Sequence, residues 1–314
     1  MSGGLITFGE ALGVVAAVEP GPLASGAAMR MDFAGAEATV AIGVRRLGHS
    51  AAWTGCVGAD AIGVMVLDRL RAERIDVSGC RIDTEVPSGL MVRERRTADR
   101  IRATYYRRGL AGSRLSAADV DARRIAKCRV LHLTGITPAL SDSAREAVRA
   151  ALDAAVDAGV TVSFDINYRR ALWSPDAAAA ALVDLIARAD IVFAGVDEAA
   201  LLVPPGDPAA MTKALAALGP SEVVLKLGAD GALGWRDGEL FAQPALTVTS
   251  VDPVGAGDAF VAGYLAAALD GAAVPDRLLL GATCGAFAVS AQGDWAGLPY
   301  RHELGLLAAP DINR

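Results

Sequence analysis

The chain has 314 residues, of which 53% are apolar and 21% charged, and its formal net charge is −6. This apolar content is enough for a sizeable core and excludes a disordered protein. The acidic balance argues against a nucleic-acid partner. The length fits one large α/β domain with a small appendage.

The sequence lacks the marks of a zinc-binding, secreted or membrane protein. Its four cysteines and three histidines are scattered, without the spacing of a zinc site or a disulfide framework. Residues 1–4 contain no basic segment before an apolar run, so no signal peptide is predicted. The longest apolar runs, Ala259–Leu269 and Leu278–Ala291, are too short to span a bilayer. We expect a soluble, cytoplasmic protein.

Short apolar runs typical of strands alternate with alanine-rich helical stretches. Strands are predicted at Leu5–Phe8, Ala51–Val57, Val130–Leu133, Val160–Phe164, Ile191–Ala194 and Val223–Leu227. Helices are predicted at Ala36–Leu47, Ala61–Glu73, Asp142–Ala158, Asp176–Ala189, Asp207–Leu218, Gly257–Leu269 and Pro275–Ser290. This alternation indicates a parallel sheet with helices on both faces. In such sheets ligands bind beyond the carboxyl ends of the strands.

Two segments interrupt the alternation. Val14–Phe33 is rich in proline and glycine, and Pro87–Arg108 alternates like a hairpin with a polar turn at Thr97–Asp99. Two extra β segments predict a small sheet that projects from the main domain. Such a sheet is either a lid over the site or an oligomer interface, and the sequence does not separate these. Asp230-Gly231 and Asp237-Gly238 predict tight hairpin turns.

The string Asp-Pro-Val-Gly-Ala-Gly-Asp-Ala-Phe, residues 252–260, opens a predicted helix. The free N–H groups and positive dipole end of a helix N-terminus bind anions. Gly255 and Gly257 let a ligand approach the backbone, and Asp258 places a carboxylate beside that anion. Such a site can deprotonate an alcohol while it stabilises charge on a phosphoryl group. The simpler interpretation is a tight turn followed by an aspartate that complements the helix dipole.

The whole string resembles the signature of the ribokinase-like (PfkB) sugar kinases, and residues 34–63 resemble the second signature of that family. It matches neither a Walker A loop nor a Rossmann fingerprint. Five further stretches resemble the 2-keto-3-deoxygluconate kinases within the family: Tyr105–Ser113, Leu131–Leu140, Asp165–Arg169, Leu172–Pro175 and Gly293–Arg301. The resemblance runs over nearly the whole chain.

The resemblance implies a three-layer α/β/α sandwich with a mainly parallel central sheet and a small β-sheet lid. Residues 1–13, 34–86 and 109–314 would form the main domain, and residues 14–33 and 87–108 the lid, which could also be an oligomer interface. The implied reaction is ATP-dependent phosphorylation of 2-keto-3-deoxygluconate at its 6-hydroxyl, with Mg²⁺. The implied partners are the sugar acid, ATP and further copies of the chain.

For catalysis, the resemblance implies that Asp258 takes the hydroxyl proton. The backbone N–H groups of Gly255, Ala256 and Gly257 would stabilise the transferred group, while Arg169 and Mg²⁺ would neutralise phosphate oxygens.

A keto-sugar acid carries a carboxylate, so its kinase needs a fixed cation. Arg107 beside Tyr105 could supply a planar guanidinium and a hydroxyl. Asp294 would bind sugar hydroxyls by resemblance, although an aspartate in a glycine-flanked turn can be purely structural. Gly35, Thr39 and Met91 fall at substrate positions of the family. A solvated face is expected for the arginines that alternate along the predicted strands: Arg93, Arg95, Arg100 and Arg102.

The predicted nucleotide side combines two loops. Asn167 and Arg169 follow a predicted strand, and Arg169 would lie between sugar acid and phosphates. The second loop holds Lys226, Gly228, Ala229, Asp230 and Gly231. These glycines either let the backbone approach a nucleotide or only form the turn between strands. Glu198 matches the acidic end of a magnesium-linked family motif and would act indirectly, or it only compensates a helix dipole.

The chain departs from the family pattern at Ala34, Thr39, Met91 and Gly195, where Gly, Asn, Tyr and Asn are usual. Threonine offers one hydroxyl where asparagine offers a donor and an acceptor. These departures weaken the choice of sugar more than the choice of reaction. Alternatives left open are the galactose-series epimer, fructose or ribose as substrate, or a non-catalytic sugar-acid sensor.

Overall fold

The central sheet is mainly parallel, as predicted. The computed structural model describes residues 3–97 and 100–308. Within them the strand order is β14-β13-β12-β11-β10-β9-β1-β4, and β13 and β14 run antiparallel to their neighbours. The bounds are β1 Leu5–Phe8, β4 Ala51–Thr54, β9 Val130–Thr134, β10 Thr161–Asp165, β11 Ile191–Gly195, β12 Glu222–Lys226, β13 Ala232–Arg236 and β14 Glu239–Gln243.

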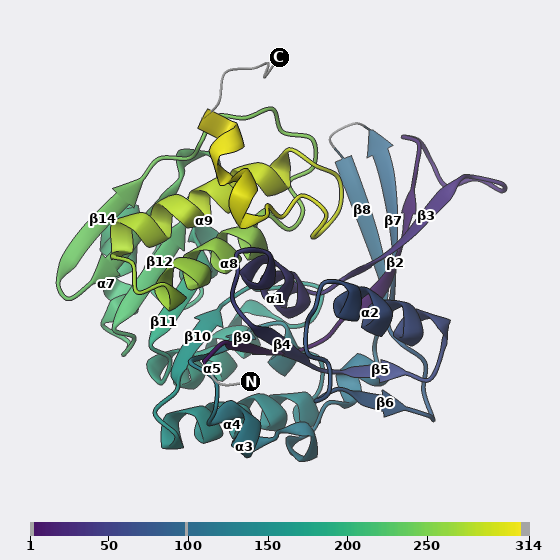
Figure 1. The fold of residues 1–314 in the computed structure, drawn as a ribbon, viewed down its shortest axis with the longest axis horizontal. Helices are drawn as coiled ribbons and strands as arrows, with labels where there is room; N and C mark the ends of the chain where they lie inside the picture. The colour runs from purple at the N-terminus through teal and green to yellow at the C-terminus, as the bar shows by residue number, and fades with distance from the viewer. Residues whose placement is uncertain (1–2, 98–99, 309–314) are drawn as a thin grey trace.

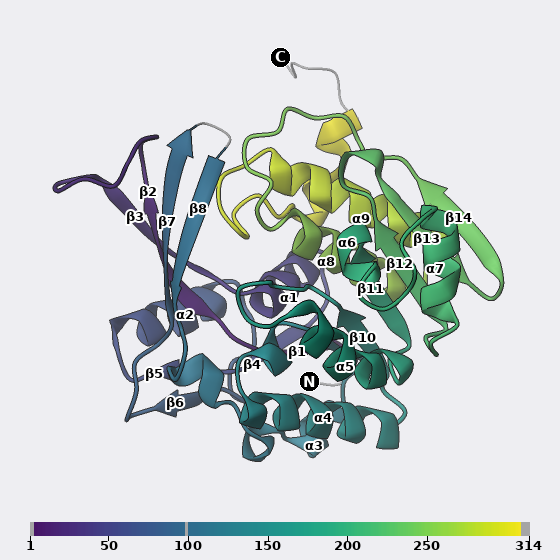
Figure 2. The same cartoon turned by 180° about the vertical axis from the view of Figure 1, so that it is seen from behind.

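Helices cover both faces of this sheet, which confirms the three-layer sandwich (Figures 1 and 2). One face carries α1 (Ala36–Arg46), α8 (Ala256–Leu269) and α9 (Val274–Val289), and the other α4 (Asp142–Asp157), α5 (Pro175–Ala187) and α7 (Pro208–Ala216). Successive strand residues therefore enter different cores: Phe193 packs in the first and Val192 in the second.

The remaining helices are short or peripheral. They are α2 (Ala61–Ala72), α3 (Ala122–Ile125), α6 (Val196–Ala199) and the 3₁₀ turns Ala111–Arg114, Ala117–Asp119, Thr137–Ala139, Gly228–Asp230 and Arg301–Ala308. None of the helices in the described part of the chain has the length and apolar character to cross a membrane.

One predicted strand is wrong. The run Ala51–Val57 divides at Gly55 into β4 and β5 (Cys56–Gly58), and β5 leaves the central sheet to pair with β6 (Arg81–Asp83). A Cβ built at Gly55 would lie 2.5 Å from the carbonyl oxygen of Gly9. The close approach of these two backbone segments explains the bend, which the apolar character of the run does not reveal.

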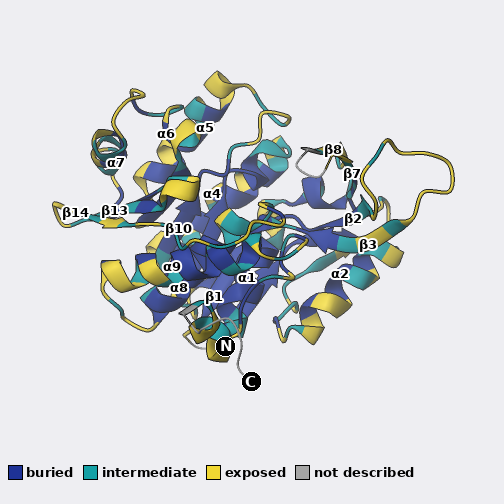
Figure 3. Cartoon of the chain, turned by 90° about the horizontal axis from the view of Figure 1, so that it is seen from above, coloured by how far each residue is buried: buried dark blue, intermediate teal, exposed yellow. Residues whose placement is uncertain are grey.

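A second sheet projects beside the first, with the order β3-β2-β7-β8 (Figure 1). Its strands are β2 (Leu12–Ala17), β3 (Met29–Ala34), β7 (Leu90–Thr97) and β8 (Arg100–Tyr106). The predicted hairpin is confirmed, since β7 and β8 pair antiparallel, whereas β2 and β7 pair parallel. The loop between β2 and β3 is exposed (Figure 3). Ala98 and Asp99 of the predicted turn, and the side chain of Arg100, lie outside the described residues.

The expected solvated face is wrong for Arg93 and Arg95. Arg93 is only 9% exposed, and Arg95 is half-buried. They alternate with residues of the outer face and share the inner face with the buried Met91. Arg102 is exposed, as expected, and its register partner Glu94 shows that it belongs to the outer face.

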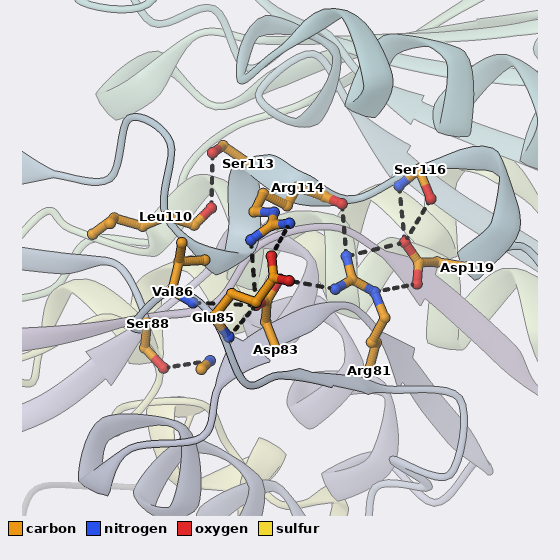
Figure 4. A network of polar contacts seen from close by, with 11 residues as sticks. Arg81, Asp83, Glu85, Val86, Ser88, Leu110, Ser113, Arg114, Ser116 and Asp119 are labelled. Carbon is orange, nitrogen blue, oxygen red and sulfur yellow. Dashed lines mark hydrogen bonds and ion pairs between the residues drawn. The ribbon is translucent and has the colours of Figure 1, made fainter.

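A network of ion pairs fixes the base of the small sheet (Figure 4). Asp83 accepts hydrogen bonds from the N–H groups of Glu85 and Val86 at 2.9 and 3.2 Å and from Arg81 at 3.0 Å. Arg81 also donates to the carbonyl oxygen of Arg114 at 2.6 Å. The chain that enters β7 and the chain that leaves β8 are therefore tied together below the sheet.

Candidate active site

The candidate site lies at the carboxyl edge of the central sheet, as predicted for this fold class. Asp165 ends β10, Asn167 follows it, and Lys226 ends β12. Asp258 lies in the first turn of α8 and contacts Asn167, whose Nδ2 donates to Oδ1 of Asp258 at 3.2 Å. The structure thus brings together residues that are 91 positions apart in the sequence.

Gly255 shapes the loop before α8. Its φ of 78° lies in the left-handed region, and a Cβ there would collide with the carbonyl oxygen of Asp294. The hydrogen-bond ladder of α8 starts from the N–H of Ala259, which donates to Gly255 at 2.8 Å. The earlier amide groups of α8 have no helix carbonyl to bind, and that of Ala256 makes only a long 3.4 Å bond to Pro253. The loop therefore keeps donors for an anion.

Asp258 has the protonation behaviour of a general base. Burial, followed by repulsion from the Asp165 carboxylate, raises the pKa of Asp258 to about 6. Arg169, which is exposed, and Lys226 oppose this shift by attraction. Asn167 holds Asp258 from an uncommon backbone conformation with φ of 40°. A base with a pKa below neutrality is ionised at pH 7 and can accept a proton.

Asp165 and Lys226 form an ion pair beneath this loop. Nζ of Lys226 lies 2.7 and 2.9 Å from the two carboxylate oxygens of Asp165. Burial alone would lower the pKa of Lys226, but attraction to Asp165 and Glu198 outweighs burial and raises it. The lysine is therefore a fixed positive charge between the central sheet and α8.

A cavity of about 590 Å³ opens beside the loop. Its lining includes Lys226, Gly228, Ala229 and Gly231, together with Ala256, Gly257 and apolar residues of α8 and α9. Asp230 is exposed at the turn. Gly231 also has a structural reason to be glycine, because a Cβ there would collide with the carbonyl oxygen of Gln243. The largely apolar lining suits a flat heteroaromatic ring, with polar groups at one end.

Glu198 is engaged by the backbone. Its two oxygens accept hydrogen bonds from the N–H groups of Tyr168 at 3.0 Å and Gly195 at 2.6 Å. This contact joins the loop that carries Asn167 and Arg169 to the start of α6. Among residues 3–97 and 100–308, no three His, Cys, Asp or Glu side chains form a group that could hold a metal ion.

The predicted sugar side carries paired charges. Arg107 forms a buried ion pair with Glu10, which follows β1, and its guanidinium lies 5.4 Å from the ring centre of Tyr105. Oε1 of Glu10, Nε of Arg107 and the hydroxyl of Thr39 are buried without a hydrogen-bond partner. Unpartnered buried polar atoms are costly unless a ligand or water satisfies them.

Three further predicted residues lie nearby in the fold. Gly35 is the N-cap residue before α1, and a Cβ there would lie 2.6 Å from the carbonyl oxygen of Glu10. Asp294 pairs with Arg93 at 2.9 Å, and Met91 is buried on the same inner face of β7 as Arg93.

Sequence reasoning missed Asp165, Glu10 and the inward position of Arg93. Asp165 stands at the end of a predicted strand, and that position was a signal for it. Glu10 lies two residues after the end of the first predicted strand, and this position was the same kind of signal. Arg93 belongs to an alternating strand, but alternation alone does not say which face is buried.

Comparison with known proteins agrees with this geometry. The model of the pfkB family carbohydrate kinases matches residues 4–301. The chain belongs to this family. This kinase is 36% identical over 304 residues to a 2-dehydro-3-deoxygluconokinase from Bacillus subtilis (strain 168), covering 95% of this chain and 93% of that protein. It is 33% identical over 299 residues to a 2-dehydro-3-deoxygalactonokinase from Haloferax volcanii, covering 94% of each.

A solved structure supports the same conclusion. Aminoimidazole riboside kinase from Salmonella enterica, complexed with aminoimidazole riboside and an ATP analog, matches with a TM-score of 0.80 and 26% identity, covering 97% of this chain and 100% of that one. The protein is thus a carbohydrate kinase with the ribokinase-like fold, as the sequence motifs predicted.

Proposed function

We propose that this kinase transfers the γ-phosphoryl group of ATP to the 6-hydroxyl of 2-keto-3-deoxygluconate (2-dehydro-3-deoxygluconate) and forms 2-keto-3-deoxy-6-phosphogluconate. One observation carries the proposal: a half-buried, ionisable Asp258 stands in the first turn of α8, beside the cavity of about 590 Å³. The residue before that helix, Gly255, touches Asp294, which pairs with Arg93 of the small sheet. The 2-dehydro-3-deoxygluconokinase relative supports the choice of sugar.

In this reaction Asp258 accepts the proton of the 6-hydroxyl as its oxygen attacks phosphorus. The amide groups of Gly255, Ala256 and Gly257 stabilise the charge on the transferred phosphoryl group. Arg169 adds a positive charge from the opposite loop, which is consistent with its effect on Asp258. Mg²⁺ would neutralise phosphate charge when it is bound.

Such an ion fits this site as a companion of ATP, because Mg²⁺ in kinases binds phosphates, waters and one or two carboxylates. Glu198 would help to hold such an ion indirectly, since both of its oxygens already accept backbone hydrogen bonds. On the nucleotide side, Lys226, Gly228, Ala229 and Gly231 would line the base and ribose, with Asn167 and the exposed Asp230 near the phosphates and the ribose.

On the sugar side, Arg107 would bind the substrate carboxylate. A guanidinium has five N–H donors, so the pair with Glu10 leaves others, including the unpartnered Nε. Thr39 and Tyr105 would supply hydroxyls, Asp294 would accept from sugar hydroxyls, and Gly35 and Met91 would shape the pocket. Residues 14–33 and 87–108 would act as the lid and as a surface for self-association.

Initial rates of ADP release test the proposal with 2-keto-3-deoxygluconate, its galactose-series epimer, gluconate, fructose, ribose and adenosine. We expect turnover with keto-deoxy acids only. Turnover with a neutral sugar alone would keep the mechanism and overturn the role of Arg107.

The galactose-series epimer is the second candidate. The 2-dehydro-3-deoxygalactonokinase relative and the substitutions Thr39 and Met91 favour keeping it open. The ratio of kcat/KM for the two epimers decides between them.

A further inference from the structure

Three arginines on the inner face of the small sheet face the loops around the N-terminus of α8. Arg30 and Arg93 both pair in register with Ala16, and Arg95 follows two residues along β7. With Asp252 and Gln292 they line a cavity of about 80 Å³ between the small sheet and the loops near the N-terminus of α8. The predicted roles of the site residues do not account for this cluster.

The first contact is an ion pair between distant segments. Nη2 of Arg93 lies 2.9 and 3.1 Å from the two carboxylate oxygens of Asp294, and the two side chains are 10% and 16% exposed. One nitrogen makes both bonds. A pair this well shielded from solvent is screened less than a surface pair.

The backbone of Asp294 extends this contact to the anion loop. Its carbonyl group packs against Gly255 so closely that no side chain would fit between them. Since Gly255 is the residue before α8, the position of Asp294 limits where the amide groups of Ala256 and Gly257 can lie.

A second contact runs parallel to the first. Asp252 accepts hydrogen bonds from Val254 at 3.1 Å and from Gly293 at 3.3 Å, and the guanidinium of Arg95 lies 4.0 Å away. Asp252 therefore ties the loop before α8 to the segment that carries Asp294. The contact of Arg95 with Asp252 is longer than that of Arg93 with Asp294, so it is the weaker of the two ion pairs.

We propose that Arg93 is a positioning residue for phosphoryl transfer: it holds Asp294 and, through the backbone of Asp294, the anion loop. Because the ion-pair network of Figure 4 fixes the base of the sheet, contacts higher on β7 determine how its inner face meets this loop. The inference rests on the proposed function, since it concerns the same reaction.

Arg93→Gln tests the proposal, with Arg102→Gln as a matched control. Arg102 lies on the outer face of the same sheet, with 79% of its side chain exposed. We expect Arg93→Gln to lower kcat about 10- to 100-fold, as for small misplacements of reacting groups. KM for ATP should change less than kcat, because Arg93 itself lies outside the nucleotide cavity. The control should keep both constants.

Arg93→Lys separates positioning from folding. Because one nitrogen makes both bonds to Asp294, an ammonium can replace part of the contact, and we expect kcat to recover at least severalfold over Arg93→Gln. Equal kcat for Arg93→Gln and Arg102→Gln would overturn the proposal. So would a loss for Arg93→Gln that is explained entirely by a smaller folded fraction, as measured by active-site titration with radiolabelled ATP.

Amide hydrogen exchange gives a readout that needs no turnover. Peptides covering residues 252–260 should exchange faster in Arg93→Gln than in Arg102→Gln, while peptides of β10 stay unchanged. If the wild type phosphorylates none of the sugars tested, the proposed function fails and this exchange difference still tests the contact. Identical exchange in both variants would refute it.

Discussion

The α8 side and the small-sheet side of the candidate site satisfy their polar groups in different ways. On the α8 side, the backbone itself supplies the donors, through a glycine-shaped loop beside a cavity of about 590 Å³. On the small-sheet side, side chains supply them, and the charged ones form ion pairs within the protein: Arg107 with Glu10, and Asp294 with Arg93.

This difference separates chemistry from selectivity. A backbone loop depends on glycines at fixed positions, so replacing one of these glycines disrupts its function. Side chains can be substituted one at a time, as at Thr39 and Met91. We therefore expect variants on the α8 side to impair the reaction and variants of Arg107 on the small-sheet side to change its substrate. Arg93 is the exception on the small-sheet side, because it acts on the anion loop through Asp294.

Asp258→Asn should cause the largest loss. Removing the base should lower kcat about 10²- to 10⁴-fold while ADP affinity is kept. Steady-state rates and calorimetric titration with ADP measure the two effects. Asp142→Asn is the control, since Asp142 also stands in the first turn of a helix but is exposed. Half the wild-type rate in Asp258→Asn would exclude Asp258 as the base.

Arg107→Ala should change selectivity instead. The loss of a charge-assisted contact worth about 1.5–3 kcal/mol should raise KM for keto-deoxy acids roughly 10- to 100-fold. Any activity on neutral sugars should hardly change. Arg108→Ala, at the exposed neighbouring position, is the control. An equal effect on acids and neutral sugars would show that Arg107 supports the fold and does not read a carboxylate.

Two glycine variants distinguish a structural from a ligand-binding role in the loop. Gly257→Ala should fold normally, because its Cβ would meet only Nζ of Lys226 at 3.7 Å, and should raise KM for ATP roughly tenfold. Gly255→Ala should lose at least about 1–3 kcal/mol of unfolding free energy, because its φ is left-handed and the added Cβ would collide with the carbonyl oxygen of Asp294. Thermal unfolding and ATP titrations measure both. An unchanged KM for ATP in Gly257→Ala would place the phosphates elsewhere.

The pH dependence should be the smallest effect near neutrality. Because Asp258 must be ionised and its pKa is about 6, kcat/KM should be half-maximal near pH 6 and fall about tenfold per unit below it. The sign is opposite for stability: the folded carboxyl binds its proton more tightly than the unfolded one. Asp258 therefore contributes more to folding stability as the pH falls from about 6 toward 3.8, the ordinary pKa of an aspartate. A flat profile down to pH 5 would contradict the assignment.

The sequence predicted the sheet, its helices and the Gly-Ala-Gly-Asp loop, because each depends on local patterns of apolar residues and glycines. It did not predict that Gly55 divides a strand or that Arg93 points inward, because both depend on contacts with distant segments. The pair between Arg107 and Glu10 joins positions 97 residues apart and has no local signal. Long-range charge pairing is thus the part of the site that required a structure.

Phosphorus NMR of the product from ATP, Mg²⁺ and 2-keto-3-deoxygluconate tests the central claim most directly. We predict a new phosphomonoester coupled to the protons on carbon 6, formed in equal amount to ADP. Inorganic phosphate with ADP, or an ester on another carbon, would contradict the proposed placement of the 6-hydroxyl between Asp258 and the anion loop.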